Sequence, residues 1–107
     1  MYRMERVNSE IMKSLLQIIQ SMNDRRISDN IITLTYVETA PDLKTAKVGV
    51  QSENKEIVKI LNSSKSFIRR ELAKKIIMKN VPELNFVVDN TEANANRIEE
   101  LLRKIKN

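Results

Sequence analysis

Apolar residues recur every three or four positions at the start of the chain, at Met4, Val7, Ile11, Leu15, Ile18 and Met22. Arg6, Lys13 and Gln17 fall outside this stripe, so the pattern predicts an amphipathic helix over residues 4–22. Residues 23–26 have the composition of a turn. After residues 28–30 the pattern changes to a β-branched run over 31–37, which predicts a strand.

A second strand is predicted by the alternation of apolar and polar residues from Ala46 to Val50. The segment before it, residues 40–43, contains Pro41, whose fixed φ favours a turn. Because the connection between the two strands is short, we expect them to pair antiparallel.

Two consecutive helices are expected next. Ser52 or Asn54 can cap a short first helix, which carries Ile57, Val58 and Leu61. The polar stretch 62–64 interrupts it, and a second helix is expected from near Lys65, with an apolar row at Ile68, Leu72 and Ile76. This helix is expected to end before Pro82, because a residue that precedes proline avoids the α region.

A third strand and a final helix complete the pattern. Leu84, Phe86 and Val88 alternate with their neighbours as a strand, and a last amphipathic helix is predicted by Ile98, Leu101, Leu102 and Ile105. The order αββααβα over 107 residues predicts one α+β domain that spans residues 1–107, with helices covering one face of a three-stranded sheet.

The positive charge of the chain is concentrated in one predicted helix and its exit. The net charge is +5, and residues 65–80 hold six basic residues against one acidic residue, Glu71, while the other 13 basic and 13 acidic residues cancel. The six bases are Lys65, Arg69, Arg70, Lys74, Lys75 and Lys79. Such a surface favours nucleic acid as a partner, and an ordinary solvated helix face is the alternative.

The aromatic residues narrow the mode of nucleic-acid binding. Tyr2, Tyr36, Phe67 and Phe86 are too few and too dispersed for the stacking platforms of single-strand binders. Tyr36 and Phe86 lie in strand alternations, so we interpret them as packing residues, and we assign no ligand contact to Phe67. We therefore expect the protein to recognise the phosphates and the shape of a nucleic acid.

The chain lacks the residues that most enzyme reactions require. It has no His, no Cys and one Gly, so thiolate nucleophiles, imidazole bases, zinc sites built on either group and glycine-rich phosphate loops are excluded. The candidate acids Asp42, Glu71, Glu83 and Asp89 show no close pairing in sequence. We expect no enzyme activity and no cofactor.

No apolar run exceeds three residues, so we expect no membrane span or signal peptide, and a cytoplasmic location.

Several segments of the chain, taken in order, resemble the ribosome-binding factor A family. The most specific are residues 40–48 (APDLKTAKV), 67–72 (FIRREL) and 82–89 (PELNFVVD), and residues 24–27 and 97–102 give weaker support. The resemblance spans nearly the whole chain and implies a KH-like fold of the αββααβ type, with the C-terminal helix added. It implies a monomer that binds the immature small (30S) ribosomal subunit and its 16S rRNA. It also implies assistance to late rRNA maturation, including the 5′-terminal helix region, without catalytic residues.

The chain departs from related patterns at three places. The Gly-x-x-Gly loop with which a standard KH domain holds the nucleic-acid backbone is absent, because the only glycine, Gly49, lies in a predicted strand. Where the family has an Ala-x-Gly kink between its two central helices, this chain has Ser64-Lys65-Ser66, and we expect Ser64 and Ser66 at the helix junction. Arg25 stands where the family more often has proline.

Among the six bases, Arg70 and Lys74 are the foremost candidates for phosphate contacts, because both lie opposite the apolar row of their helix. Further candidates for RNA binding are Arg25, Arg26 and Lys44, with Lys47 beside them. A different class of function stays open: a non-catalytic interaction module that docks a partner through the amphipathic C-terminal helix. The apolar stripe of that helix can equally cover the domain's own sheet.

Overall fold

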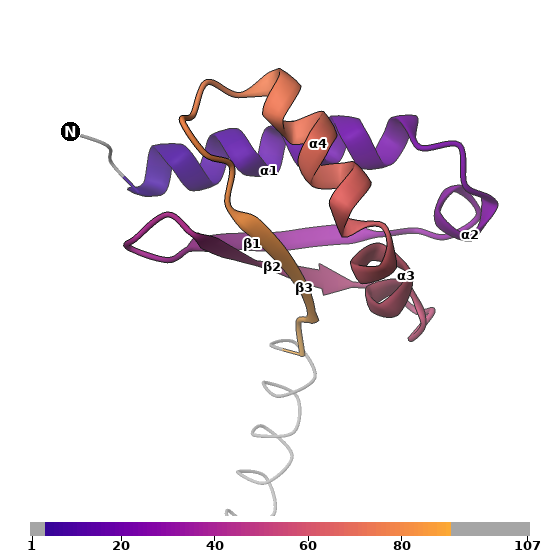
Figure 1. The fold of residues 1–107 in the computed structure, drawn as a ribbon. Coiled ribbons are helices and arrows are strands. Elements are labelled where there is room, and N and C mark those ends of the chain that lie inside the picture. Colours follow the sequence, from indigo (N-terminus) through magenta and orange to yellow (C-terminus); the bar gives the residue numbers. More distant parts are fainter. Residues whose placement is uncertain (1–3, 91–107) are drawn as a thin grey trace, which may run out of the picture.

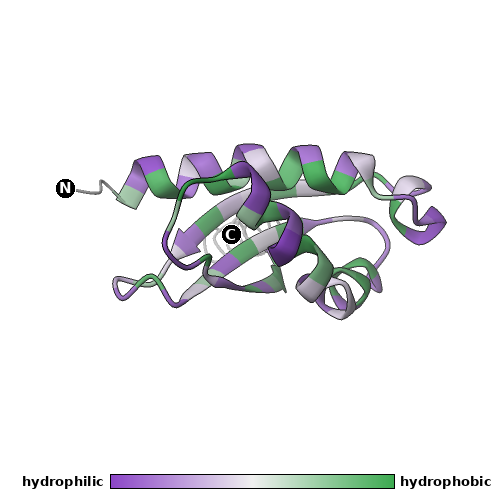
Figure 2. Ribbon diagram, turned by 45° about the horizontal axis from the view of Figure 1, so that its top comes forward, coloured by the Kyte–Doolittle hydropathy of each residue, from purple (hydrophilic) through white to green (hydrophobic). Residues whose placement is uncertain are grey.

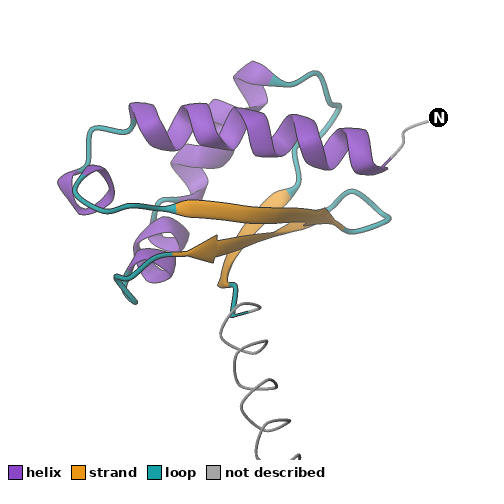
Figure 3. Cartoon of the chain, turned by 180° about the vertical axis from the view of Figure 1, so that it is seen from behind, coloured by secondary structure: helices purple, strands orange, loops and turns teal. Residues whose placement is uncertain are grey.

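A computed structural model describes residues 4–90 of the chain, and Figures 1 and 3 show its elements from two sides. In chain order they are α1 (Met4–Ser21), α2 (Arg25–Ser28), β1 (Thr33–Thr39), β2 (Thr45–Gln51), α3 (Ile57–Ser63), α4 (Lys65–Lys75) and β3 (Glu83–Val88). The KH-like order αββααβ is therefore confirmed, with α2 as an additional short helix. The expected C-terminal helix around Ile98 to Ile105 lies outside the described residues.

Helix α1 is the amphipathic helix that the sequence predicts. Val7, Ile11, Leu15 and Ile18 are all buried, at the spacing of one helix face. Figure 2 shows hydrophobic and hydrophilic residues alternating along this helix and along the strands. None of the helices in residues 4–90 is long and apolar enough to cross a membrane.

The three strands form one sheet in the order β1-β2-β3. Strands β1 and β2 pair antiparallel, as expected, and β2 and β3 pair parallel after a crossover through α3 and α4. The turn between β1 and β2 contains Leu43 at a φ of 62°, in the left-handed region. The strand predicted at 31–37 begins instead at Thr33, and Ile31 before it is 88% exposed.

Helices α1 and α4 lie over one face of the sheet, as Figures 1 and 3 show, and the core fills the space between. The strands contribute alternate residues to this core, among them Val37, Ala46, Val48, Val50, Leu84 and Phe86. On the opposite face, the ring of Tyr36 occupies the space where a Cβ on Gly49 would stand. Phe86 and Tyr36 are thus packing residues, one in the core and one on the outer face of the sheet.

Helix α2 replaces the turn predicted at residues 23–26. Asp24 is its N-cap, because one side-chain oxygen accepts a hydrogen bond from the backbone N–H of Arg26 at 3.0 Å. Ile27 is buried and anchors the helix. The expected side-chain cap of α3 is absent: Ser52 and Asn54 accept hydrogen bonds from Asn54 N–H and Glu56 N–H, within the loop before the helix.

Helices α3 and α4 are separated by Ser64 alone, at φ −101° and ψ 6°. Ser66 is the second residue of α4. Helix α4 ends at Lys75, earlier than the proline signal suggests, because Ile76 adopts an extended conformation at φ −119° and ψ 147°. The residues after it return as a loop to β3, with Ile76 and Pro82 buried.

Candidate nucleic-acid interface

The candidate interface is built on α4, whose inner side is fixed by the core. Ile68 and Leu72 are fully buried, and Ile76 is nearly so. At about 100° per residue, Arg70 and Lys74 lie on the side of the helix opposite this row, and Arg69 and Lys75 flank the row. All four side chains are exposed. The apolar row and the basic side that the sequence indicates are both present.

Four of the six predicted bases contact other protein groups. Lys65 pairs with Glu83 at 3.6 Å, Lys74 pairs with Glu71 at 3.3 Å, and Lys75 donates to Oε1 of Gln17 at 3.4 Å. Arg69 donates from Nε and Nη2 to the backbone oxygen of Val81, at 3.1 and 2.7 Å. Arg69 thereby holds the loop after α4 against the helix.

The remaining two bases, Arg70 and Lys79, are exposed, and within residues 4–90 neither forms an ion pair or a side-chain hydrogen bond. Their charges are not compensated by any described protein group. An exposed ion pair contributes only about 0–1 kcal/mol, so Lys65 and Lys74 could exchange their carboxylates for a phosphate. Arg70 and Lys79 need no such exchange.

The other predicted bases are dispersed over the molecule. Lys44 lies in the β1–β2 turn, beside the start of β3, because its carbonyl accepts the N–H of Glu83 at 2.9 Å. Lys47 is on the outer face of the sheet and is exposed. Arg25 and Arg26 are in α2, at the end of the molecule away from the loop that follows α4 (Figure 1). These last two do not extend the surface formed by α4.

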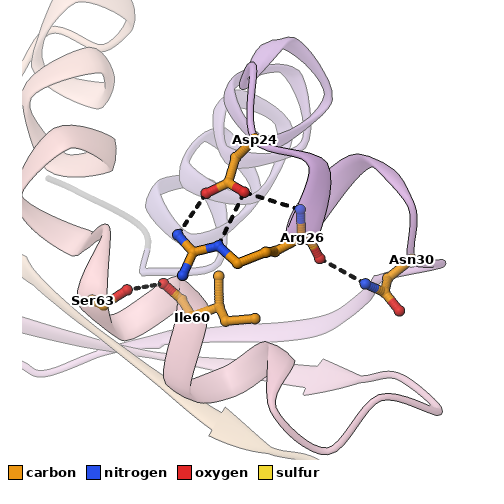
Figure 4. Close-up of polar contacts among 5 residues, drawn as sticks. All are labelled: Asp24, Arg26, Asn30, Ile60 and Ser63. Atoms are coloured by element: carbon orange, nitrogen blue, oxygen red, sulfur yellow. Dashed lines mark hydrogen bonds and ion pairs between the residues drawn. The ribbon is translucent and has the colours of Figure 1, made fainter.

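Arg26 is engaged by its own neighbour. Figure 4 shows its guanidinium facing the carboxylate of Asp24, with Nη2 to Oδ2 at 2.8 Å and Nε to Oδ1 at 3.1 Å. These hydrogen bonds lower the pKa of the Asp24 carboxyl and raise the pKa of the Arg26 guanidinium. Arg26 also accepts a hydrogen bond at its backbone oxygen from Asn30. Its described hydrogen bonds are therefore with the residues that flank α2 on either side.

The candidate acids have local partners as well. Glu71 and Glu83 each pair with a lysine, and Asp42 accepts the backbone N–H of Lys44 at 3.0 Å. Within the described part of the chain, no three His, Cys, Asp or Glu side chains come together in a group that could hold a metal ion.

Phe67 is a surface residue that the sequence pattern left without a role. It is 43% exposed on α4 and lies three positions before Arg70. The sequence could have indicated this exposure, because Phe67 lies off the apolar row of Ile68 and Leu72. No sequence pattern indicates the bond from Arg69 to Val81, because the two residues are twelve positions apart.

The family model described as ribosome-binding factor A matches residues 3–102 of the chain. A relative from Clostridium perfringens (strain SM101 / Type A), named ribosome-binding factor A, is 38% identical over 112 residues, which cover 98% of this chain and 96% of the relative.

Two structures carry the same family name. The crystal structure of ribosome-binding factor A from Thermus thermophilus has a TM-score of 0.74 at 20% identity, over 80% of this chain and 94% of that one. A homology model of the Thermus thermophilus factor, fitted into a cryo-electron microscopy map of a 30S complex, has a TM-score of 0.65 at 21% identity, over 78% of this chain and 91% of that one. These two likenesses concern the fold. Because the family model and the Clostridium relative both extend over nearly the full chain, the protein belongs to the ribosome-binding factor A family.

Proposed function

We propose that this protein binds the immature small (30S) ribosomal subunit through its 16S rRNA and assists the late maturation of that RNA, including the 5′-terminal helix region. The observation that carries the proposal is the concentration of the whole net charge of +5 on α4 and the loop after it. The family name and the 30S complex of the Thermus thermophilus relative support the choice of partner.

The mode of binding follows from the chemistry of α4. Its outer side offers guanidinium and ammonium groups that match phosphates, and the phosphate backbone supplies most of the affinity of such contacts. The chain has no His or Cys, so the proposed action is binding without catalysis, as one KH-like RNA-binding domain and as a monomer when free. Stabilising one arrangement of the RNA by phosphate contacts requires no reactive side chain.

The first experiment replaces Arg70 and Lys74 together by glutamate and measures binding to purified 30S subunits between about 50 and 200 mM salt. Both residues are exposed, so we expect a change in unfolding free energy under about 0.5 kcal/mol. Binding should weaken, and the slope of log K against log salt should become shallower by about 0.7–0.9 for each phosphate that the variant no longer binds.

A matched control is available on α3 and the loop before it. Lys55→Glu with Lys59→Glu makes the same change in charge at two exposed positions outside residues 65–79. This pair should retain most of the affinity and the slope. If the α4 variant binds as well as the wild type, with the same slope, α4 is not the interface. If the wild-type protein co-sediments with translating ribosomes rather than with free small subunits, the proposed function itself is wrong.

The proposed role in 16S rRNA maturation can be tested separately from binding. In cells depleted of the protein, we expect small subunits that carry unprocessed 16S rRNA ends to accumulate. The control variant should restore processing, and the Arg70/Lys74 variant should not. Normal 16S rRNA ends after depletion would contradict the maturation role and leave the binding result standing.

A further inference from the structure

A hollow of about 410 Å³ lies between α4 and the loop that returns from it to β3. Its walls are one side of the helix, with Ser66, Arg70 and Ala73, and the loop residues Met78, Lys79 and Asn80. The hollow is shallow and open to solvent, and its volume falls within the range of about 300–1,000 Å³ seen for pockets of small organic ligands, so a group of the size of one nucleotide can lie against its walls.

The hollow is held open by internal contacts of the protein. The two hydrogen bonds from Arg69 to the backbone oxygen of Val81 tie the far wall to the helix. Burial of Ile76 and Pro82 anchors both ends of the loop in the core. Because its guanidinium is committed to Val81, Arg69 forms part of the wall, and the groups that can receive a ligand are those beside it.

The described lining of the hollow combines cationic, polar and apolar groups. Its described lining contains no acidic residue, and it contains the two uncompensated cations, Arg70 and Lys79. Ser66 and Asn80 add a hydroxyl and an amide, and Ala73 and Met78 add apolar surface. A phosphate alone would use only the cations. A nucleotide uses the cations for its phosphate, the apolar surface for the face of its base and the polar groups for its edges.

We propose that this hollow receives one unpaired nucleotide of RNA, with its phosphate between Arg70 and Lys79 and its base against Ala73 and Met78. This inference rests on the proposed function and makes it more specific. Contacts of α4 with phosphates would hold any RNA, whereas the hollow would select RNA in which one nucleotide leaves the helical stack.

The test compares three hairpin RNAs: one fully paired, one with a single bulged uridine, and one with an abasic residue at the bulge. We expect the wild-type protein to bind the uridine bulge about fivefold more tightly than the paired hairpin, because the base covers apolar surface of the hollow. The abasic bulge should bind like the paired hairpin, because it keeps the phosphate, which paired RNA also offers, and lacks the base that would pack against Ala73 and Met78. Equal affinity for the uridine and abasic bulges would overturn the proposal.

A substitution that fills the hollow provides the second arm. Ala73 is exposed on α4, so Ala73→Leu occupies the space without changing charge or breaking a core contact. It should abolish the preference for the uridine bulge and leave the affinity for the paired hairpin and its salt slope unchanged. Ser9→Leu on α1, also at an exposed position, is the control and should keep the preference.

The outcomes separate the two proposals. If Ala73→Leu lowers the melting temperature, Ala73→Gln fills the same space with a polar side chain and is measured in its place. Retention of the preference in a folded filled variant overturns the nucleotide site. Salt-dependent binding of the paired hairpin and of 30S subunits without any bulge preference also overturns it, and leaves the proposed function intact. Failure of the wild type to bind 30S subunits contradicts the proposed function.

Discussion

Two adjacent arginines on α4 have different partners, and only the structure separates them. Arg69 donates two hydrogen bonds to Val81, whereas the side chain of Arg70 forms no hydrogen bond or ion pair with a described group. In the sequence both belong to one basic run. The planar fork of a guanidinium can hold one carbonyl oxygen with two N–H groups, which an ammonium group cannot reproduce at the same place.

This difference predicts different results for the same substitution at the two positions. Arg69→Lys should lower the unfolding free energy by about 1 kcal/mol, because the paired N–H groups on Val81 are removed. Arg70→Lys should leave it within about 0.5 kcal/mol of the wild type. Chemical denaturation measures both, and amide exchange should be faster in residues 76–82 of the Arg69 variant only. Equal stability of the two variants would show that the bond to Val81 does not hold the loop.

At the scale of elements, hydrophobic periodicity is enough to predict α1, β2 and β3, since each buries residues at a regular spacing. The ends of elements depend on contacts that periodicity does not contain. Strand β1 begins at Thr33 because its pairing with Gln51 starts there, although the β-branched run begins at Ile31. Helix α2 depends on the cap from Asp24, a residue that is equally common in turns.

The candidate site also has one part that the sequence predicts and one part that it does not. The buried row of α4 and its exposed bases follow from spacing and charge, which are properties of the sequence. The hollow beside α4 does not, because its far wall depends on the early end of the helix at Lys75 and on the bond from Arg69 to Val81. An isolated basic run cannot show which of its members are already engaged by the protein.

The junction of α3 and α4 gives a prediction at this scale. Ser66 lies in the first turn of α4, and within residues 4–90 only Leu43 has a positive φ, so the bend at Ser64 does not use the freedom of glycine. Ser66→Gly should therefore lower the unfolding free energy, by about 0.5 kcal/mol, and Ser66→Ala should preserve or raise it. Thermal unfolding of the two variants measures this order. A more stable glycine variant would mean that Ser66 is strained in the native protein.

At the scale of the whole molecule, we expect the positive charge on α4 to lower the stability of the fold and to raise the affinity for RNA. The six bases within residues 65–80 repel one another in the free protein, only one acid lies among them, and Arg70 and Lys79 have no described counter-ion. Unbalanced charge of this kind destabilises the compact state, and the same charge attracts phosphates. The fold thus gives up some stability at the place where it would bind RNA.

Neutralising Arg70 and Lys79 should therefore raise stability and lower RNA affinity. Arg70→Gln with Lys79→Gln should raise the melting temperature at low salt by about 2–4 °C, the equivalent of ~0.5 kcal/mol for a domain of this size, and weaken RNA binding. The gain should vanish in about 1 M salt, where the Debye length falls to about 3 Å. Lys74→Gln, which removes a cation already paired with Glu71, should raise the melting temperature less. Loss of stability at low salt in the double variant would show that Arg70 and Lys79 hold the fold together, and their candidacy as phosphate ligands would lose its basis.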